Sequence, residues 1–249
     1  MPSASYLRSP LHHVKIILVE PQTPGNVGAV ARAMKNFGLS QLILVNPCDY
    51  LSDEARWMAV HAEEILERAK VVTTLEQALE GVALAVATTA RKRDTHFPSF
   101  TPNETAERIH EVNAKQSVAI VFGRERNGLL NEEIYQCQIQ SSIPTFHAHN
   151  SLNLSQAVMV YLYELFQATL SGNPNFVWDY AEPSQMETLY ARIQKVLELS
   201  EFKSRKTIDD FMLGVKRVFG RTPFEDRDVR LFHKIFQEIE FFIKHRSKK

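Results

Sequence analysis

The sequence VKIILVEPQTPGNVGAVARAMKNFGLSQLILV, residues 14–45, decides the fold because it holds two strands with one helix between them. The apolar, β-branched run at residues 14–19 predicts the first strand, and the run at residues 41–45 predicts the second. A Pro-Gly turn opens a helical pattern at residues 26–37, and Gly38 marks its end. A strand, a helix and a strand in this order predict a βαβ unit, whose strands lie parallel in one sheet.

The same alternation continues to residue 170. Further strands are predicted at residues 70–73, 82–88, 117–122 and 138–143, and further helices at residues 62–69, 75–79 and 152–170. Strands that alternate with helices form a mostly parallel sheet that is covered on both faces. We therefore predict an α/β fold for this part of the chain.

The last third of the chain has a different character. Residues 171–183 contain two prolines and a glycine, which break the periodicity. Three amphipathic helical patterns follow, at residues 184–199, 207–219 and 225–245. We predict an α/β domain at residues 1–170, a linker at residues 171–183 and a helical extension at residues 184–249.

The composition is that of an ordinary globular protein, with 44% hydrophobic and 23% charged residues. Lys and Arg together number 29, as do Asp and Glu, so a nucleic-acid partner would have to be attracted by a local basic patch. The two cysteines have no CxxC spacing, which argues against a zinc ribbon and fits a reducing compartment. No apolar leader and no run of roughly 18 apolar residues is present, so we expect a cytoplasmic protein without a membrane partner.

Two polar segments in the first half of the chain could form a binding site. The first, EPQTPGNVGAVAR at residues 20–32, is neither a P-loop nor a G-x-G-x-x-G fingerprint, which argues against a nicotinamide-dependent oxidoreductase. Its small residues would let the helix approach the sheet or a ligand closely, whereas Arg32 taken alone is more typical of a solvated helix arginine. The second, FGRERNGL at residues 122–129, follows a strand at the sheet edge where ligands bind, although a simple charged turn explains it equally well.

A third segment, IPTFHAHNSLNLSQ at residues 143–156, leads into the last helix of the α/β domain. Ser151 and Asn153 lie at the start of that helix, where they cap it, hold a carboxylate, or do both. His147 and His149 have no cysteine or carboxylate companion nearby, so we interpret them as polar loop residues and predict no metal site.

The order of these segments, with Thr-Thr-Ala-Arg at residues 88–91 between the first two, resembles the SPOUT superfamily of RNA methyltransferases in its TrmH-like branch. Residues 26–38 match motif 1 of that branch, residues 122–129 match motif 2, and residues 143–155 match motif 3. The helical extension is similar to that of tRNA-specific members, so the resemblance covers nearly the whole chain. One departure is His61, which stands where the family pattern has glycine.

The resemblance implies a deep trefoil knot, a homodimer, and loops that bind S-adenosylmethionine for methyl transfer to a ribose 2′-hydroxyl. The cofactor-binding residues that it implies are Thr88, Thr89, Ala90, Gly123, Ile143, Ser151, Leu152 and Asn153. The catalytic residues that it implies are Arg32, Asn26, Ser151 and Asn153. Because arginine keeps its charge in proteins, we expect Arg32 to stabilise the developing alkoxide rather than to act as a free base.

The resemblance also implies a tRNA substrate, with cytidine or uridine at anticodon-loop nucleotide 32 as the target. The RNA-binding residues that we expect are Arg91, Arg93, Lys216, Arg217 and Arg221. Two alternatives stay open: a TrmH-like enzyme for another tRNA or rRNA nucleotide, and a non-catalytic RNA-binding protein with the same fold. Glu125 either holds its loop through an arginine such as Arg124 or Arg126, or contacts the substrate.

Overall fold

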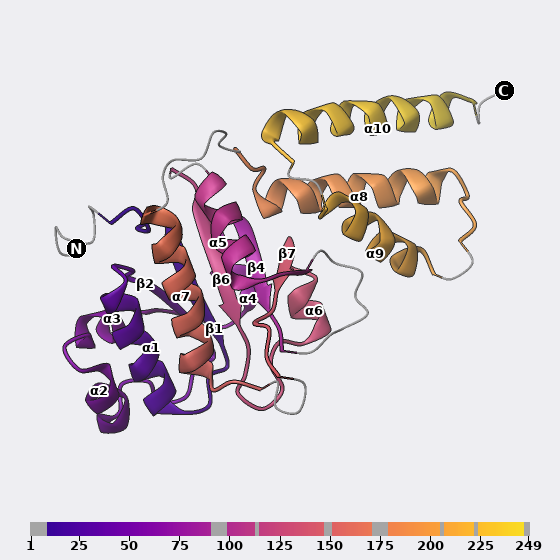
Figure 1. Ribbon diagram of the computed structural model, residues 1–249. Coiled ribbons are helices and arrows are strands. Elements are labelled where there is room, and N and C mark those ends of the chain that lie inside the picture. Colours follow the sequence, from indigo (N-terminus) through magenta and orange to yellow (C-terminus); the bar gives the residue numbers. More distant parts are fainter. Residues whose placement is uncertain are drawn as a thin grey trace. The chain divides into compact units, whose positions relative to one another are not determined.

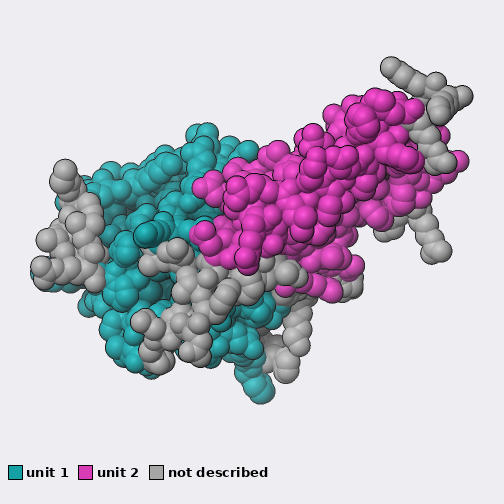
Figure 2. All heavy atoms as spheres, turned by 90° about the horizontal axis from the view of Figure 1, so that it is seen from above, with its two compact units in different colours: residues 1–177 teal, residues 178–249 magenta. Residues whose placement is uncertain are grey.

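The structure is a computed structural model that describes residues 9–90, 99–112, 115–146, 151–170, 179–204, 207–221 and 224–246. The chain divides into two compact units, Met1–Val177 (unit 1) and Trp178–Lys249 (unit 2), which Figure 2 shows in different colours.

The described part of unit 1 contains a seven-stranded sheet in the order β3-β2-β1-β6-β4-β7-β5, and all neighbouring strands are parallel. The strands are β1 (Val14–Val19), β2 (Gln41–Val45), β3 (Lys70–Val72), β4 (Val82–Thr88), β5 (Ser99–Phe100), β6 (Ser117–Phe122) and β7 (Ile139–Ser141). The predicted α/β fold with a mostly parallel sheet is confirmed. Sequence reasoning missed β5, because two residues are too short to show an alternating pattern.

Helices cover both faces of the sheet. They are α1 (Pro24–Asn36), α2 (Asp53–Ala59), α3 (Glu63–Glu67), α4 (Leu75–Ala78), α5 (Pro102–Glu111), α6 (Asn131–Ile134) and α7 (Leu154–Leu170). On one face α1 lies between α2 and α7, and α7 also packs on α5 (Figure 1). On the other face, α4 and α6 contribute buried side chains to the same core cluster as the strands, among them Leu75, Ala78 and Ile134.

Helix α5 was not predicted, although the sequence carries its start signal. The Thr101 hydroxyl accepts the backbone N–H of Glu104, and the Glu104 carboxylate accepts the backbone N–H of Thr101, which together make a capping box. Pro102 follows at the first helical position, where its missing N–H costs nothing. The Thr-Pro-Asn-Glu sequence at residues 101–104 therefore indicates the start of a helix.

The core of unit 1 lies around its central strands. Ile16, Ile17 and Leu18 are successive residues of β1, and each side chain is fully buried. Successive strand residues point to opposite faces of a sheet, so burial of all three shows that both faces are covered. The Phe122 ring at the end of β6 packs edge-on against the Tyr161 ring of α7, with 5.5 Å between the ring centroids. This contact fixes α7 over the carboxyl end of β6.

The described part of unit 2 contains three helices, α8 (Pro183–Leu199), α9 (Ile208–Phe219) and α10 (Asp226–Arg246). Its core contains Leu189, Ile193, Met212 and Val229, with partly buried aromatic rings packed against them. In the described residues of both units, no helix combines the length and the apolar character that crossing a membrane requires.

Candidate active site

The start of helix α1 is capped by a side chain from a distant segment. The Glu125 carboxylate accepts hydrogen bonds from the backbone N–H groups of Gln22 and Thr23, at 2.8 and 3.0 Å. Thr23 is the N-cap residue of α1, but its own side chain makes no capping bond. The first N–H groups of a helix lack intrahelical partners, and negative charge is favourable beside them. Glu125 therefore accepts the two backbone N–H groups just before α1, including that of the N-cap residue, and ties the loop after β6 to this helix.

Asn26 continues this connection to the third polar segment. Its Nδ2 donates to Glu125 Oε1 at 3.0 Å, and its Oδ1 accepts from Asn153 Nδ2 at 2.9 Å. Asn153 Oδ1 accepts the backbone N–H of Ser155 at 2.9 Å and the Ser155 hydroxyl at 2.7 Å, and so caps α7. The side chains of Glu125, Asn26 and Asn153, which we call the amide chain, thus join all three polar segments.

The helix starts at both ends of the amide chain set the direction of its bonds. The N–H groups at the start of α7 need an acceptor, so Asn153 turns its oxygen toward them and its amino group toward Asn26. Asn26 must then turn its own amino group toward Glu125, whose ionised carboxylate is acceptor-only. Partial burial raises the pKa of the Glu125 carboxyl, but the hydrogen bonds that it accepts lower the pKa more, so the net pKa lies below the ordinary value.

The neighbouring Arg124 holds the loop itself. Its Nε donates to Glu20 at 2.8 Å, and its two terminal nitrogens donate to the two Glu133 oxygens at 3.0 Å each. The hydrogen bond from Arg124 lowers the pKa of the Glu20 carboxyl. The Arg124 side chain is 12% exposed, and its backbone exchanges two hydrogen bonds with Gly128. The structure therefore places the start of α1 and Asn26, rather than Arg124, as the anchor of Glu125.

Two glycines of the predicted motifs are required by packing. A Cβ on Gly123 would lie 2.1 Å from the carbonyl carbon of Gly128, so the loop could not close over any larger residue. A Cβ on Gly28 would lie 2.0 Å from the carbonyl oxygen of Ala55 in α2. The small residues of the first segment were predicted to allow close approach to the sheet or to a ligand. At Gly28 the close neighbour is helix α2.

Arg32 lies two turns into α1 and is exposed. Within the described residues its guanidinium group has no hydrogen-bond or ion-pair partner. An arginine whose five N–H groups are free can bind a phosphate or an oxyanion without first breaking an internal contact. Its helix, in contrast, is held firmly at its start by the amide chain.

The residues predicted to bind the cofactor lie at the carboxyl ends of β4, β6 and β7 and at the start of α7. Thr88 ends β4, and its hydroxyl donates to the carbonyl of Val121 at 2.9 Å. This hydrogen bond joins the ends of the neighbouring strands β4 and β6. The N–H of Thr89 donates to the carbonyl of Ser141 at 2.9 Å. The other predicted binders are Ala90, Gly123, Ile143, Ser151, Leu152 and Asn153, and the ends of parallel neighbouring strands bring their segments to one edge.

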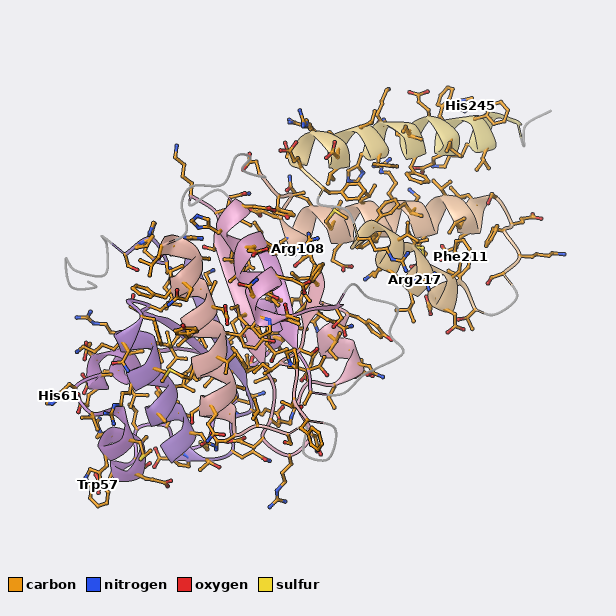
Figure 3. The ribbon with its side chains drawn as sticks, in the orientation of Figure 1. Trp57, His61, Arg108, Phe211, Arg217 and His245 are labelled. Carbon is orange, nitrogen blue, oxygen red and sulfur yellow. The ribbon has the colours of Figure 1, made fainter. Side chains whose placement is uncertain are left out.

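The predicted RNA-binding residues are distributed between the units. Arg91 and Arg93, like the loop residues His147 and His149, lie outside the described residues. Lys216, Arg217 and Arg221 belong to α9 and the residues after it in unit 2. Figure 3 labels Arg217 on this helix. Lys216 is bound to the Glu187 carboxylate, with 2.9 and 3.0 Å to its two oxygens. The Nε of Arg217 is buried without a hydrogen-bond partner among the described residues.

Metal and thiol chemistry receive no support from the described part of the chain. It contains no group of His, Cys, Asp and Glu side chains that could hold a metal ion. Burial raises the pKa of the Cys137 thiol to about 12, which keeps it protonated and unreactive at neutral pH.

A family model, protein relatives and solved structures all indicate similarity to RNA methyltransferases. The model of the SpoU rRNA Methylase family matches residues 13–163. TrmJ of Sodalis glossinidius, a tRNA (cytidine/uridine-2′-O-)-methyltransferase, is 35% identical over 237 residues, which are 92% of this chain and 92% of the relative. TrmJ of Pseudomonas aeruginosa, which is named for cytidine, uridine and adenosine, is 35% identical over 243 residues, 92% of this chain and 95% of the relative.

The crystal structure of TrmJ from Z. mobilis is also similar, with a TM-score of 0.76 and 30% identity. The match covers 91% of this chain and 98% of that chain, so it includes the helical extension. The resemblance predicted from the three polar segments is confirmed. The chain therefore belongs to the SpoU methylase family, in its TrmJ group.

Proposed function

We propose that this protein transfers a methyl group from S-adenosylmethionine to the 2′-hydroxyl of a ribose in tRNA. The relatives that match the chain over its length are named for this reaction. The observation that carries the proposal is the amide chain, which joins the three motif segments at the start of α1. The same helix carries Arg32, which is exposed and has no hydrogen-bond or ion-pair partner in the described residues. The presence of Arg32, Asn26, Ser151 and Asn153 together argues against a non-catalytic RNA-binding protein with the same fold.

The side chains at the strand ends suit the proposed cofactor. S-adenosylmethionine has an apolar-faced adenine ring and polar ends, which call for aliphatic side chains and free backbone groups. Leu152 is 37% exposed, Leu130 is exposed and Ile143 is half-buried at this edge. We assign cofactor binding to Thr88, Thr89, Ala90, Gly123, Ile143, Ser151, Leu152 and Asn153. When bound, the cofactor supplies an electrophilic methyl group, so the protein needs chiefly to align the acceptor and stabilise its charge.

The catalytic residues divide into two kinds of role. Arg32 holds the phosphate or the developing 2′-alkoxide of the substrate, because its charge is permanent and its donors are free. Asn26 and Asn153 act as positioning residues, because both amide groups are already occupied by hydrogen bonds. Ser151 is exposed at the α7 start, and we assign it to contact with substrate or cofactor.

We further propose that the target is cytidine or uridine at nucleotide 32 of the anticodon loop. The positive charge that binds the tRNA backbone would come from Arg91, Arg93, Lys216, Arg217 and Arg221. Lys216 would have to leave the Glu187 carboxylate before it could bind a phosphate. Methylation of another tRNA or rRNA nucleotide is the alternative, since the family model is named for rRNA.

A homodimer, the predicted trefoil knot and a cytoplasmic location belong to the same proposal. The outer face of α7 is apolar and exposed over several turns, at Met159, Tyr163, Phe166 and Leu170. The Tyr163 and Phe166 rings also pack against Phe37 at the end of α1. A second copy is the occupant that we propose for this face, because exposed apolar patches of this kind mark interfaces.

The test is methylation of unmodified tRNA transcripts by the full chain with methyl-labelled S-adenosylmethionine. We expect label in a 2′-O-methyl nucleoside, and loss of label from a transcript with a 2′-deoxynucleotide at position 32. A transcript with a 2′-deoxynucleotide at position 34 is the matched control and should remain a substrate. Label that persists in the first transcript and disappears in the second would move the target to nucleotide 34.

A further inference from the structure

Helix α2 carries a tryptophan that is almost fully exposed. The Trp57 side chain is 78% exposed, and that of its neighbour Met58 is 47% exposed. Figure 3 shows the Trp57 ring pointing away from the rest of unit 1. A large aromatic side chain in water loses the free energy that burial would provide, so this position calls for an explanation.

Helix α2 is held rigidly against α1. The Gly28 position lies against the Ala55 carbonyl and Met58, and the Gly25 position lies against the Glu54 carboxylate. Arg56 fixes α2 from the other side, because its Nη1 binds the Glu67 carboxylate at 3.0 Å. The exposed ring is therefore mounted on a helix whose position relative to α1 is set by backbone contact.

The contact with α2 and the free arginine share one face of α1. Residues 25, 28 and 32 are separated by three and four positions, and such residues lie on the same side of an α-helix. Arg32 thus lies on the side of α1 that α2 covers, one turn beyond the contact at Gly28. In Figure 1, α2 lies at the same end of the sheet as the starts of α1 and α7, where the amide chain is found.

We propose that Trp57 stacks on an unpaired nucleobase of the RNA substrate, next to the nucleotide whose ribose Arg32 holds. This proposal rests on the proposed function and assigns a positioning residue to it. Single-stranded loops are recognised through bases that are splayed out and stacked on aromatic rings, while arginines bind the adjoining backbone. Trp57 and Arg32 provide these two partners on neighbouring helices.

The charges around Trp57 disfavour a phosphate at this position. Asp53 lies one turn before Trp57 on α2, and Glu54 faces the start of α1. These carboxylates would repel a phosphate, whereas the face of a base is neutral. A second copy of the chain is better matched by the apolar face of α7, whose rings gather around Phe37 at the opposite end of α1.

Tryptophan fluorescence tests the proposal directly, because the chain has two tryptophans, Trp57 and Trp178. In a Trp178→Phe variant of the full chain, the emission comes from Trp57. We expect titration with an unmodified tRNA transcript to quench this emission, with the same midpoint as binding measured by filter retention. Unchanged emission at tRNA concentrations that are bound and methylated would overturn the proposal while leaving the proposed function intact. No methylation and no tRNA binding would overturn both.

Steady-state kinetics supply the second readout. We expect Trp57→Ala to raise KM for tRNA about tenfold, a typical effect of losing one base–aromatic stack, with a smaller change in kcat and an unchanged Kd for the cofactor. Trp57→Phe should recover most of the loss, and Val71→Ala, at an exposed apolar residue of β3, should behave as the unmodified chain. A change in dimer mass of the Trp57→Ala variant by sedimentation would assign the ring to a subunit contact and overturn the proposal.

Discussion

The start of helix α1 and its third turn differ in their contacts with the rest of the protein. At the start, Glu125 and Asn26 satisfy one another and the backbone, and Asn153 extends the connection to α7. Two turns later Arg32 is exposed and has no partner in the described residues. The same helix thus has a start that is fixed by hydrogen bonds and, two turns later, an exposed charged group that is available to a substrate.

This difference separates residues that position from residues that react. A group that must meet substrate is most effective when no internal contact has to be broken first, while its position must be fixed by other groups. Mutation can change the positioning residues and the reacting residue separately.

The largest effect on activity is expected from removing the exposed Arg32. Arg32→Ala should lower kcat for tRNA methylation about 100-fold or more, because a preorganised charge opposite a developing oxyanion is typically worth this much. The melting temperature and cofactor affinity should not change, since Arg32 is exposed and makes no hydrogen bond or ion pair with a described residue. Arg68→Ala, another exposed arginine, is the matched control. Near-normal turnover of the Arg32 variant would remove the arginine from catalysis.

Crowding the contact between α1 and α2 should have the next largest effect. Gly28→Ala places a Cβ 2.0 Å from the Ala55 carbonyl oxygen, so α2 has to move, at a cost of about 1 to 3 kcal/mol in the free energy of unfolding. Gly214→Ala is the control, because a Cβ there meets open space inside α9 and should leave stability unchanged or raise it by up to about 1 kcal/mol. Equal melting temperatures for the two variants would contradict the packing role of Gly28.

Removing the charge of the Glu125 carboxylate tests whether this residue fixes the start of α1. Glu125→Gln should lower the free energy of unfolding at pH 7 by about 1 to 2 kcal/mol, because charge-assisted hydrogen bonds become neutral ones. Turnover should fall as well, since Arg32 depends on the position of α1. The control is Glu132→Gln, at an exposed carboxylate in the first turn of α6.

The pH dependence of that difference has a definite sign. The folded-state pKa of Glu125 lies below its ordinary value of 4.5, so its stabilisation is complete above that pH and is lost as the pH falls through the folded-state pKa. Unfolding curves of the unmodified chain and the Glu125 variant should therefore converge on acidification. A gap that widens toward low pH would show that Glu125 is protonated in the folded protein.

The two hydrogen-bonding roles of Asn153 can be separated by a third change. Asn153→Asp keeps an oxygen to cap α7 but cannot donate to Asn26 Oδ1, so we expect nearly unchanged stability and lower turnover. Asn153→Ala removes both roles and should cost about 1 kcal/mol in addition. Thermal melts and methylation rates of the two variants check this prediction. Turnover equal to that of the unmodified chain in both variants would show that the hydrogen bond to Asn26 has no function.

The smallest effect is expected at the turn after α2. His61 has a backbone φ of +63°, in the left-handed region where only glycine is unstrained. His61→Gly should raise the free energy of unfolding by up to about 1 kcal/mol, partly offset by the greater freedom of glycine in the unfolded chain, without changing turnover. A lower melting temperature would mean that the imidazole stabilises the turn.

Much of the fold was predictable because its signals are local. The buried strands β1, β2, β4 and β6 are continuous apolar runs, and their predicted bounds agree with the structure. The ends of β3 and β7 were less clear, because strands of three residues show too little periodicity. The catalytic role of Arg32 was predicted only through the family resemblance, since Arg32 taken alone is more typical of a solvated helix arginine, whereas the polar pattern itself indicated Ser151 and Asn153.

The sequence by itself determined a parallel α/β domain, a helical extension and the three polar segments, because periodicity, turns and motif order are properties of neighbouring residues. Only the tertiary structure decided that Glu125 caps α1, that Asn26 bonds Asn153, and that Gly28 is small to admit α2. These contacts join residues far apart in the chain, and no local pattern specifies which partners a carboxylate or an amide finds after folding.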